Sequence, residues 1–375
     1  MTHTHEPGKI ALFIPSLHGG GAERVMVSLA NGLARRGIAV DLVLVKDAGV
    51  YRSQVDARVR VVDLKGRRAL TSLFALASYL RREKPDAMLS AMNYVNVVAV
   101  WSRLLSGSKT RLVLSEHANL SQALADTKGW VAKVLPRLMK ATYGRADAIV
   151  AVSDGVAADL AATLGYPRNA ISTRHNPIET IELADKSRET PDHPWFGSGE
   201  PPVIIGVGRL SKEKDFPTLI EAFNQLRKAL PVRLAILGEG GERPALESLI
   251  SASPYKNDIL LAGFKANPYS WMHRAAVFVL SSRWEGFGNV LVEAMACGTP
   301  VVSTACPSGP QEILEHGKWG RLVPVGNAQA LADALRLTLA DPSPPDVRKR
   351  AEAFSVAHAV DAYLNVLDPE CLIAS

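Results

Sequence analysis

Two stretches of the chain share one pattern of hydrophobic and polar positions. Residues 9–45 run from an apolar stretch through a glycine cluster into apolar positions at helical spacing (Val25, Leu29, Leu33), and then into a second apolar stretch. Residues 201–240 repeat this plan, with a Gly-Arg turn before a helix that opens near Pro217. Each stretch predicts a strand–helix–strand unit of a parallel sheet. Two such units predict an α/β protein with two domains, each built on its own parallel sheet.

A domain boundary is predicted where this periodicity disappears. Pro, Gly and polar residues accumulate over residues 186–202, which is typical of a linker. We therefore expect an N-terminal domain over 1–185 and a C-terminal domain over 186–354. Ligands of open α/β sheets bind at the carboxyl ends of the strands, so a cleft between the two domains is the expected site.

Composition narrows the choice of partners and compartment. The 375 residues carry a formal charge of +6, which favours an anionic partner such as a nucleotide, a nucleic acid or an acidic membrane surface. No basic-aromatic motif indicates nucleic acid. Cys297, Cys306 and Cys371 form neither a metal-ligand pair nor a disulfide framework. No uncharged apolar run reaches about 18 residues, so we expect a cytoplasmic protein.

The run from 277 to 300 holds the clearest candidate chemistry. The pattern predicts a strand over 277–281, a loop with Glu285, and a helix capped by Asn289 that carries Glu293 near its start. Free backbone N–H groups at such a helix start bind anions, so the segment combines a phosphate site with two carboxylates that can bind hydroxyl groups. A nucleotide sugar has both features. Alternatively, Glu293 complements the helix dipole and Glu285 is a solvated loop residue.

The spacing Glu285-x7-Glu293, followed by Ala-Met-Ala-Cys-Gly-Thr-Pro-Val-Val, resembles the signature of family 4 retaining glycosyltransferases. The resemblance extends along the chain through GGGAER (19–24), SEH (115–117), GRLSKEKD (208–215), LGEGGER (237–243) and GFKANPY (263–269). It implies the GT-B fold, in which two Rossmann-like domains face each other across a cleft. The donor would bind the C-terminal domain and the acceptor the N-terminal domain, and a helix over about 355–375 would cross back to the first domain.

The resemblance also implies catalytic roles. Glu285 would bind hydroxyls of the transferred sugar, and Glu293 the ribose diol of the donor. Arg209 and Lys214 match the diphosphate-binding pair. Both precede a predicted helix, where the helix dipole disfavours cations unless an anion is present. His117 would contact the donor near the reacting carbon, although a lone histidine is more often structural.

Further residues match donor-binding positions of the family. Gly20 and Gly21 would allow the backbone to approach the diphosphate, although three glycines also suit a plain strand-to-helix turn. Phe287, Gly288 and Asn289 would offer backbone amides to the sugar and the pyrophosphate. Gly240, Gly263 and Phe264 match the nucleobase region, with turns and a core aromatic as the alternative.

The resemblance to this family also implies a metal-independent reaction without a cofactor. The chain contains no Asp-x-Asp, which removes the usual metal-binding motif of the other major transferase fold. The departing diphosphate would accept the proton of the acceptor, so no carboxylate nucleophile of the glycosidase kind is required. The base rate of the family favours a UDP-hexose or UDP-N-acetylhexosamine as donor, and a surface polysaccharide or lipid-linked oligosaccharide as acceptor.

Two segments have the amphipathic character of membrane-surface helices. Residues 128–145 place Lys133, Arg137 and Lys140 on one face, which suits peripheral contact with an anionic membrane. Residues 67–84 also combine apolar positions with basic ends, but there we favour a helix packed on the core.

Other functions remain open. A GT-B nucleotide-sugar epimerase or hydrolase would share the donor site but need no acceptor. An NAD-dependent dehydrogenase is disfavoured, because neither glycine cluster completes G-x-G-x-x-G. A non-catalytic sugar-binding or nucleic-acid-binding protein would fit the basic charge alone.

Overall fold

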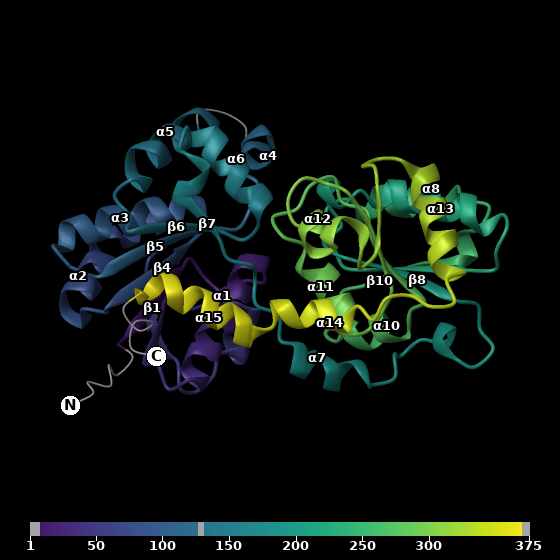
Figure 1. Cartoon of the computed structure of the whole chain (residues 1–375), viewed down its shortest axis with the longest axis horizontal. Coiled ribbons are helices and arrows are strands. Elements are labelled where there is room, and N and C mark those ends of the chain that lie inside the picture. The colour runs from purple at the N-terminus through teal and green to yellow at the C-terminus, as the bar shows by residue number, and fades with distance from the viewer. Residues whose placement is uncertain (1–7, 127–130, 370–375) are drawn as a thin grey trace. The chain divides into compact units, whose positions relative to one another are not determined.

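The computed structural model describes residues 8–126 and 131–369, which form two compact units (Figure 1). The first unit holds the chain up to Ile178 together with the C-terminal segment from Ser355. The second unit holds everything between these points, so it begins seven residues before the expected boundary at 185/186. The reason is that the helix over Thr180–Ser187 contacts the helices Pro268–Arg274 and Asn289–Ala296 of the second unit.

The first unit is built on a seven-stranded sheet in the order β3-β2-β1-β4-β5-β6-β7, in which every strand pair is parallel. Its strands are β1 (Ile10–Ile14), β2 (Val40–Leu44), β3 (Arg60–Asp63), β4 (Ala87–Ala91), β5 (Arg111–Glu116), β6 (Ala148–Ala151) and β7 (Ile171–Thr173). Its helices are α1 (Gly21–Arg35), α2 (Leu73–Glu83), α3 (Asn93–Ser106), α4 (Leu120–Asp126), α5 (Val131–Tyr143), α6 (Asp154–Leu164) and α15 (Val356–Leu367).

Burial explains why these segments form a sheet covered on both faces. All five residues of β1 and all five of β2 are buried, as expected for parallel strands between two layers of helices. α1 and α15 contact each other and close one side of the core around Leu33 and Tyr363. Gly32 permits this approach, since a Cβ atom there would lie 2.6 Å from Cγ1 of Val356.

The second unit is built on a six-stranded parallel sheet in the order β10-β9-β8-β11-β12-β13. Its strands are β8 (Val203–Val207), β9 (Arg233–Leu237), β10 (Ile259–Gly263), β11 (Val277–Leu280), β12 (Val301–Thr304) and β13 (Arg321–Val323). Its helices are α7 (Thr180–Ser187), α8 (Phe216–Arg227), α9 (Arg243–Ser251), α10 (Pro268–Arg274), α11 (Asn289–Ala296), α12 (Pro310–Ile313), α13 (Ala328–Leu339) and α14 (Arg348–Ala351).

Candidate functional site

The strand order of the second unit marks one place for a ligand. β8 and β11 are neighbours in the middle of the sheet; the chain continues from β8 to β9 on one side and from β11 to β12 on the other. This is a topological switch point, and ligands of open α/β sheets bind at the carboxyl ends of the strands there. The loops that follow these two strands, residues 208–215 and 281–288, carry the strongest sequence candidates.

Lys214 of the first loop and Glu285 of the second loop are in contact. The distance from Lys214 Nζ to Glu285 Oε1 is 2.5 Å, and Ser282 Oγ donates a second hydrogen bond of 2.6 Å to the same oxygen. Ser281 Oγ in turn donates to the carbonyl oxygen of Lys214 at 2.7 Å. Only 17% of the lysine side chain and 10% of the glutamate side chain are exposed. The switch point therefore holds a largely desolvated pair of opposite charges.

A second ion pair holds the two loops together. Arg283 donates its backbone N–H to the carbonyl oxygen of Glu213 at 2.7 Å, and its Nε lies 3.2 Å from Asp215 Oδ2. Asp215 is buried and adopts a left-handed conformation with φ of 47° at the start of α8. Asp215 lies within the motif at 208–215, but its role is not visible in the sequence, because its partner Arg283 is 68 positions away along the chain.

The start of α11 differs in detail from the expectation. Its N-cap is Gly288 rather than Asn289, which is the first residue of the helix. Gly288 has φ of 101°, a conformation that glycine adopts without steric penalty. Phe287 is buried, and its ring packs edge-on against Phe354 with centroids 5.4 Å apart. The expected donor contact of Phe287 therefore rests on its backbone, since the side chain serves the core.

Glu293 lies one turn inside α11, as expected, and its side chain is buried with 2% of the residue exposed. Its negative charge adds to burial in raising the pKa of the nearby Cys297 thiol to about 12. The helix dipole stabilises an acidic side chain near the helix start by about 0.3–1 kcal/mol, whereas burying a charge costs several kcal/mol. Dipole complementarity alone is therefore a poor account of this position.

The remaining predicted residues of the second unit lie on neighbouring loops. Arg209 is exposed after β8. Gly240 follows β9, and a Cβ atom there would overlap the carbonyl oxygen of Leu210 in the same loop as Arg209. Gly263 ends β10 with φ of 72°, and Phe264 beside it is 77% exposed. The local backbone thus favours glycine at both positions, whereas the exposure of Phe264 excludes the alternative that it is a core aromatic residue.

The glycine cluster of the first unit lies at the corresponding switch point, where β1 and β4 are neighbours. Gly20 is the N-cap of α1 with φ of −80°, and Gly21 is its first residue. The residue whose conformation calls for glycine is Gly19, with φ of 116°, which the sequence analysis did not single out. Met92, directly after β4, also has a positive φ, of 82°; strained residues of this kind gather at functional sites.

His117 follows β5 at the carboxyl edge of the same sheet. Its Nε2 lies 3.0 Å from Ser115 Oγ, and its Nδ1 is buried without a hydrogen-bond partner among the described residues. Burial lowers the pKa of His117 to about 4, so the ring is neutral at pH 7. A neutral ring can donate one hydrogen bond and accept another.

Glu116, the neighbour of His117, is a buried acid that the sequence analysis missed. Asn96 of α3 donates to its Oε1 at 2.9 Å, and the hydroxyl of Tyr143 of α5 donates to the same oxygen. Burial raises the pKa of Glu116 to about 7. The available sequence signal was a glutamate at the end of an apolar strand. These bonds join two helices to the strand that positions His117.

The two amphipathic segments both form helices, and each also exposes side chains. Residues 128–130 lie outside the described residues, and the rest of the first segment forms α5 with Lys133, Arg137 and Lys140 exposed. In 67–84, which was expected to pack on the core, Leu70 and Phe74 are exposed. Among the described helices, none combines the length and apolar character needed to cross a membrane.

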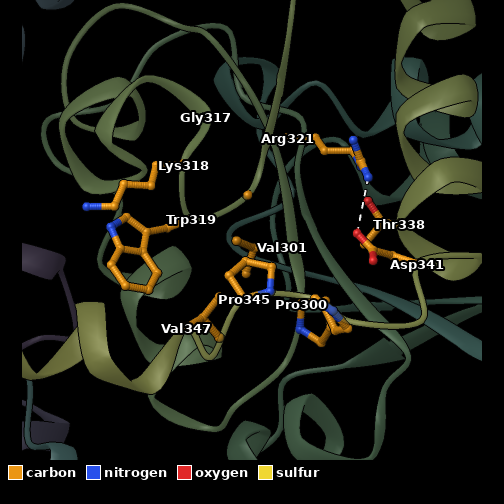
Figure 2. A pocket seen from close by; sticks show the side chains of 12 residues that line it. Pro300, Val301, Gly317, Lys318, Trp319, Arg321, Thr338, Asp341, Pro345 and Val347 are labelled. Atoms are coloured by element: carbon orange, nitrogen blue, oxygen red, sulfur yellow. Dashed lines mark hydrogen bonds and ion pairs between the residues drawn. The ribbon is translucent and has the colours of Figure 1, made fainter.

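A pocket of about 170 Å³ lies elsewhere in the second unit (Figure 2). It is lined by Pro300 and Val301 at the amino end of β12, whereas the pair Lys214–Glu285 lies beyond carboxyl ends of strands. Its charged residues are already paired: Arg321 lies 3.3 Å from Asp341, and Lys318 lies 2.8 Å from Glu315. Since pockets for cofactors and drug-sized ligands span about 300–1,000 Å³, we do not assign the donor to it.

Comparison with known proteins identifies the family to which the chain belongs. Residues 19–182 match the family described as Glycosyltransferase Family 4, and residues 189–355 match Glycosyl transferases group 1. The chain belongs to glycosyltransferase family 4, and it is a glycosyltransferase of the GT-B fold. A similar structure is that of Anabaena Alr3699/HepE in complex with UDP-glucose, with a TM-score of 0.80 at 22% identity over 96% of this chain and 100% of that one. TarM gives a TM-score of 0.78 at 15% identity, covering 97% and 99%.

Two relatives span nearly the whole chain. A Campylobacter jejuni N-acetylgalactosamine-N,N'-diacetylbacillosaminyl-diphospho-undecaprenol 4-alpha-N-acetylgalactosaminyltransferase is 30% identical over 89% of this chain and 90% of its own length. The Rhizobium meliloti lipopolysaccharide core biosynthesis glycosyltransferase LpsE is 29% identical, covering 93% and 96%.

Proposed function

We propose that this chain is a retaining glycosyltransferase that transfers a hexose or N-acetylhexosamine from a UDP-sugar to a lipid-linked saccharide. The observation that carries the proposal is the contact of Lys214 with Glu285 at the switch point of the second unit, 2.5 Å apart and largely desolvated. A cation beside a hydroxyl-binding carboxylate suits the junction of diphosphate and sugar in such a donor. The buried Glu293 lies on the helix that follows.

The charges suggest how the donor would be held. A diphosphate would compete with Glu285 for Lys214, with the exposed Arg209 as a second cation. Glu285 would then bind hydroxyls of the sugar, and Glu293 the ribose diol. The N-terminus of α11 would add backbone N–H groups. These groups stabilise the negative charge that grows on the leaving diphosphate, so we propose that no metal ion is needed.

His117 and the departing diphosphate would have separate roles in the transfer step. The bond from the anomeric carbon to the diphosphate oxygen breaks while the acceptor hydroxyl oxygen bonds to that carbon from the same side. The hydroxyl proton passes to the departing diphosphate. Because burial lowers the pKa of His117 to about 4, its neutral ring suits a hydrogen bond to the sugar rather than general-base catalysis at pH 7.

The acceptor is proposed from the relatives. The name of the Campylobacter jejuni relative includes a diphospho-undecaprenol saccharide as its acceptor. Such a lipid lies at a membrane, so we propose that the chain works at the inner face of the cytoplasmic membrane, with Lys133, Arg137 and Lys140 of the segment 128–145 facing anionic lipid.

A transfer assay tests this proposal. The purified chain is incubated with each of several UDP-sugars and a synthetic lipid-diphosphate monosaccharide, with and without a chelator. We expect transfer from one UDP-sugar, an unchanged rate in chelator, and retained α-configuration by NMR of the product. Inverted configuration, or activity that Mg²⁺ alone restores, would contradict the retaining, metal-independent mechanism. Epimerised or hydrolysed donor at the same rate without acceptor would instead identify the epimerase or hydrolase alternative.

A further inference from the structure

The carboxyl end of β5 sends successive side chains to opposite faces of the first sheet. Alternate residues of a strand share a face. Glu116 lies on the face covered by α3 and α5, whose side chains hydrogen-bond to it. Ser115 shares the face of Val113, which packs with Tyr363 of α15 in one core cluster. Ser115 is therefore on the side of the sheet that α15 covers.

α15 belongs to the C-terminal segment and contacts both β4 and β5 (Figure 1). Two arginines of the sheet region bind its backbone. Arg111 at the start of β5 donates from Nε to the carbonyl oxygen of Val366 at 2.8 Å, and Arg174 donates from Nε to the carbonyl oxygen of Ala362 at 2.8 Å. These bonds fix the place of Tyr363 relative to β5.

The hydroxyl group of Tyr363 lies inside the core. Tyr363 is fully buried, and burial raises its pKa to about 12, a rise that the neighbouring Ser115 side chain partly offsets. The hydroxyl approaches Ser115 without reaching the geometry of a full hydrogen bond, and it has no partner elsewhere in the described part of the chain. Since a buried hydroxyl without a partner costs free energy, Ser115 is the acceptor to which this hydroxyl is best directed.

The hydroxyl group of Ser115 in turn contacts His117, with 3.0 Å between Oγ and Nε2. The ring of His117 is neutral at pH 7, as shown above, so one of its nitrogens carries a proton and the other accepts. The hydrogen bond made by one nitrogen decides where this proton lies. The direction of the bond between Ser115 and His117 therefore decides whether Nδ1 is a donor or an acceptor.

The number of hydroxyl hydrogens favours one direction. If Ser115 donates to Nε2, its oxygen is free to accept the hydrogen of Tyr363, and Nδ1 of His117 carries the ring proton. If Nε2 donates to Ser115 instead, the Ser115 hydrogen turns toward Tyr363, and the Tyr363 hydrogen has no acceptor among the described residues. Because buried polar groups are satisfied wherever possible, the first arrangement is the more stable one.

We propose that Ser115 and Tyr363 are positioning residues that hold His117 with its proton on Nδ1, so that Nδ1 donates a hydrogen bond to an oxygen of the bound sugar. Nδ1 is buried and has no hydrogen-bond partner among the residues that the structure describes, as suits a donor that binds a ligand. The inference rests on the proposed function for the identity of that ligand. It deepens this function by stating which nitrogen acts and which side chains direct it.

NMR of the free chain tests the assignment without any substrate. Histidine is labelled with the heavy nitrogen isotope, and His117→Gln identifies the signals of His117 among the nine histidines. Long-range proton–nitrogen spectra should show a protonated Nδ1 and an unprotonated Nε2. Ser115→Ala and Tyr363→Phe should shift the ring toward the Nε2–H form, which free histidine side chains prefer in water.

A matched control comes from the neighbouring strand. Ser90 of β4 is also fully buried, and its hydroxyl has no partner in the described part of the chain. It pairs with Leu114, one residue before Ser115, and therefore lies on the opposite face of the sheet. Ser90→Ala should leave the signals of His117 unchanged. Circular dichroism melts of all variants show whether each is folded.

Transfer kinetics give a second readout. Losing a hydrogen bond that strengthens in the transition state lowers kcat and leaves KM nearly unchanged. We expect kcat to fall at least about tenfold in Ser115→Ala and about threefold in Tyr363→Phe, with KM for the UDP-sugar changed less than about twofold. Ser90→Ala should keep the kcat of the unmodified chain.

Three results would overturn the proposal. They are a protonated Nε2 in the unmodified chain, variants of Ser115 and Tyr363 that behave like Ser90→Ala in both measurements, and full activity of His117→Gln. Transfer that requires His117 but is indifferent to Ser115 and Tyr363 would contradict the positioning and leave the proposed function standing. The expected proton on Nδ1, lost in both variants, together with no transfer by the unmodified chain would support the positioning and contradict the proposed function.

Discussion

The buried carboxyl group of Glu116 makes the stability of the first unit depend on pH in a way that one substitution should remove. Burial raises its pKa from 4.5 to about 7, so the folded chain holds a proton there that the unfolded chain releases near pH 4.5. A raised carboxyl pKa stabilises the fold fully below pH 4.5, and this stabilisation is lost as the pH rises to about 7. Glu116→Gln keeps the neutral shape and cannot lose a proton.

The size of the effect follows from the two pKa values. Each pKa unit corresponds to about 1.4 kcal/mol, so ionising Glu116 costs the fold about 3 kcal/mol between pH 4.5 and pH 8. The carbonyl oxygen of a glutamine can still accept the hydrogen bonds that Asn96 and Tyr143 donate to Oε1. The variant should therefore exceed the unmodified chain only slightly near pH 5, and by roughly 6–12 °C in Tm above pH 7 for a domain of this size.

Scanning calorimetry of both proteins from pH 5 to pH 8 measures this difference. Taking the difference between the two proteins cancels the titration of other groups, including His117, whose pKa is lowered and whose effect runs the opposite way. A difference in Tm that stays constant across this pH range would refute the reasoning, because it would mean that Glu116 titrates as in water.

Three further substitutions test a close backbone contact and an ion pair. Gly309→Ala should lower the free energy of unfolding by at least about 2 kcal/mol, because Gly309 has φ of 92° and a Cβ atom there would overlap the carbonyl oxygen of Phe287. Gly317 has φ of 105° but lies in open space, so Gly317→Ala should lower it by only about 1 kcal/mol. Equal losses for the two variants in urea unfolding would contradict this reasoning. Asp361→Asn removes the partly exposed ion pair with Arg36 and should cost at most about 1 kcal/mol, less in high salt; a larger loss would show that the pair is effectively buried.

The sequence predicted the elements around the candidate site because their signals are local. The strand expected over 277–281 is β11 (Val277–Leu280), and the predicted ligands Lys214 and Glu285 lie in contact. What it could not predict depends on strand order and on distant partners. The boundary between the units lies before α7 because α7 contacts α10 and α11, which are far from it in sequence. Glu116 is held by Asn96 and Tyr143, neither of them close to it in sequence.

Backbone conformation was a second source of error. Asn289 was predicted as a helix cap, and Gly20 and Gly21 as site residues, because side-chain preferences and glycine clusters are visible in a sequence. The residues with positive φ are Gly288 and Gly19, and their conformations follow from how each loop leaves its strand. A pattern of residue types does not locate the end of a helix to within one residue.

Calorimetric titration with UDP tests the central claim, a nucleotide-sugar site around Lys214 and Glu293, most directly. The chain is titrated with UDP, GDP, ADP and NAD, and then as Lys214→Met, Glu293→Gln and the control Lys318→Met, which replaces an exposed lysine of the second unit. The account predicts selective binding of UDP, weakened at least about tenfold by either site variant and unchanged in the control. No nucleotide binding, preference for NAD, or UDP binding indifferent to both site variants would contradict it.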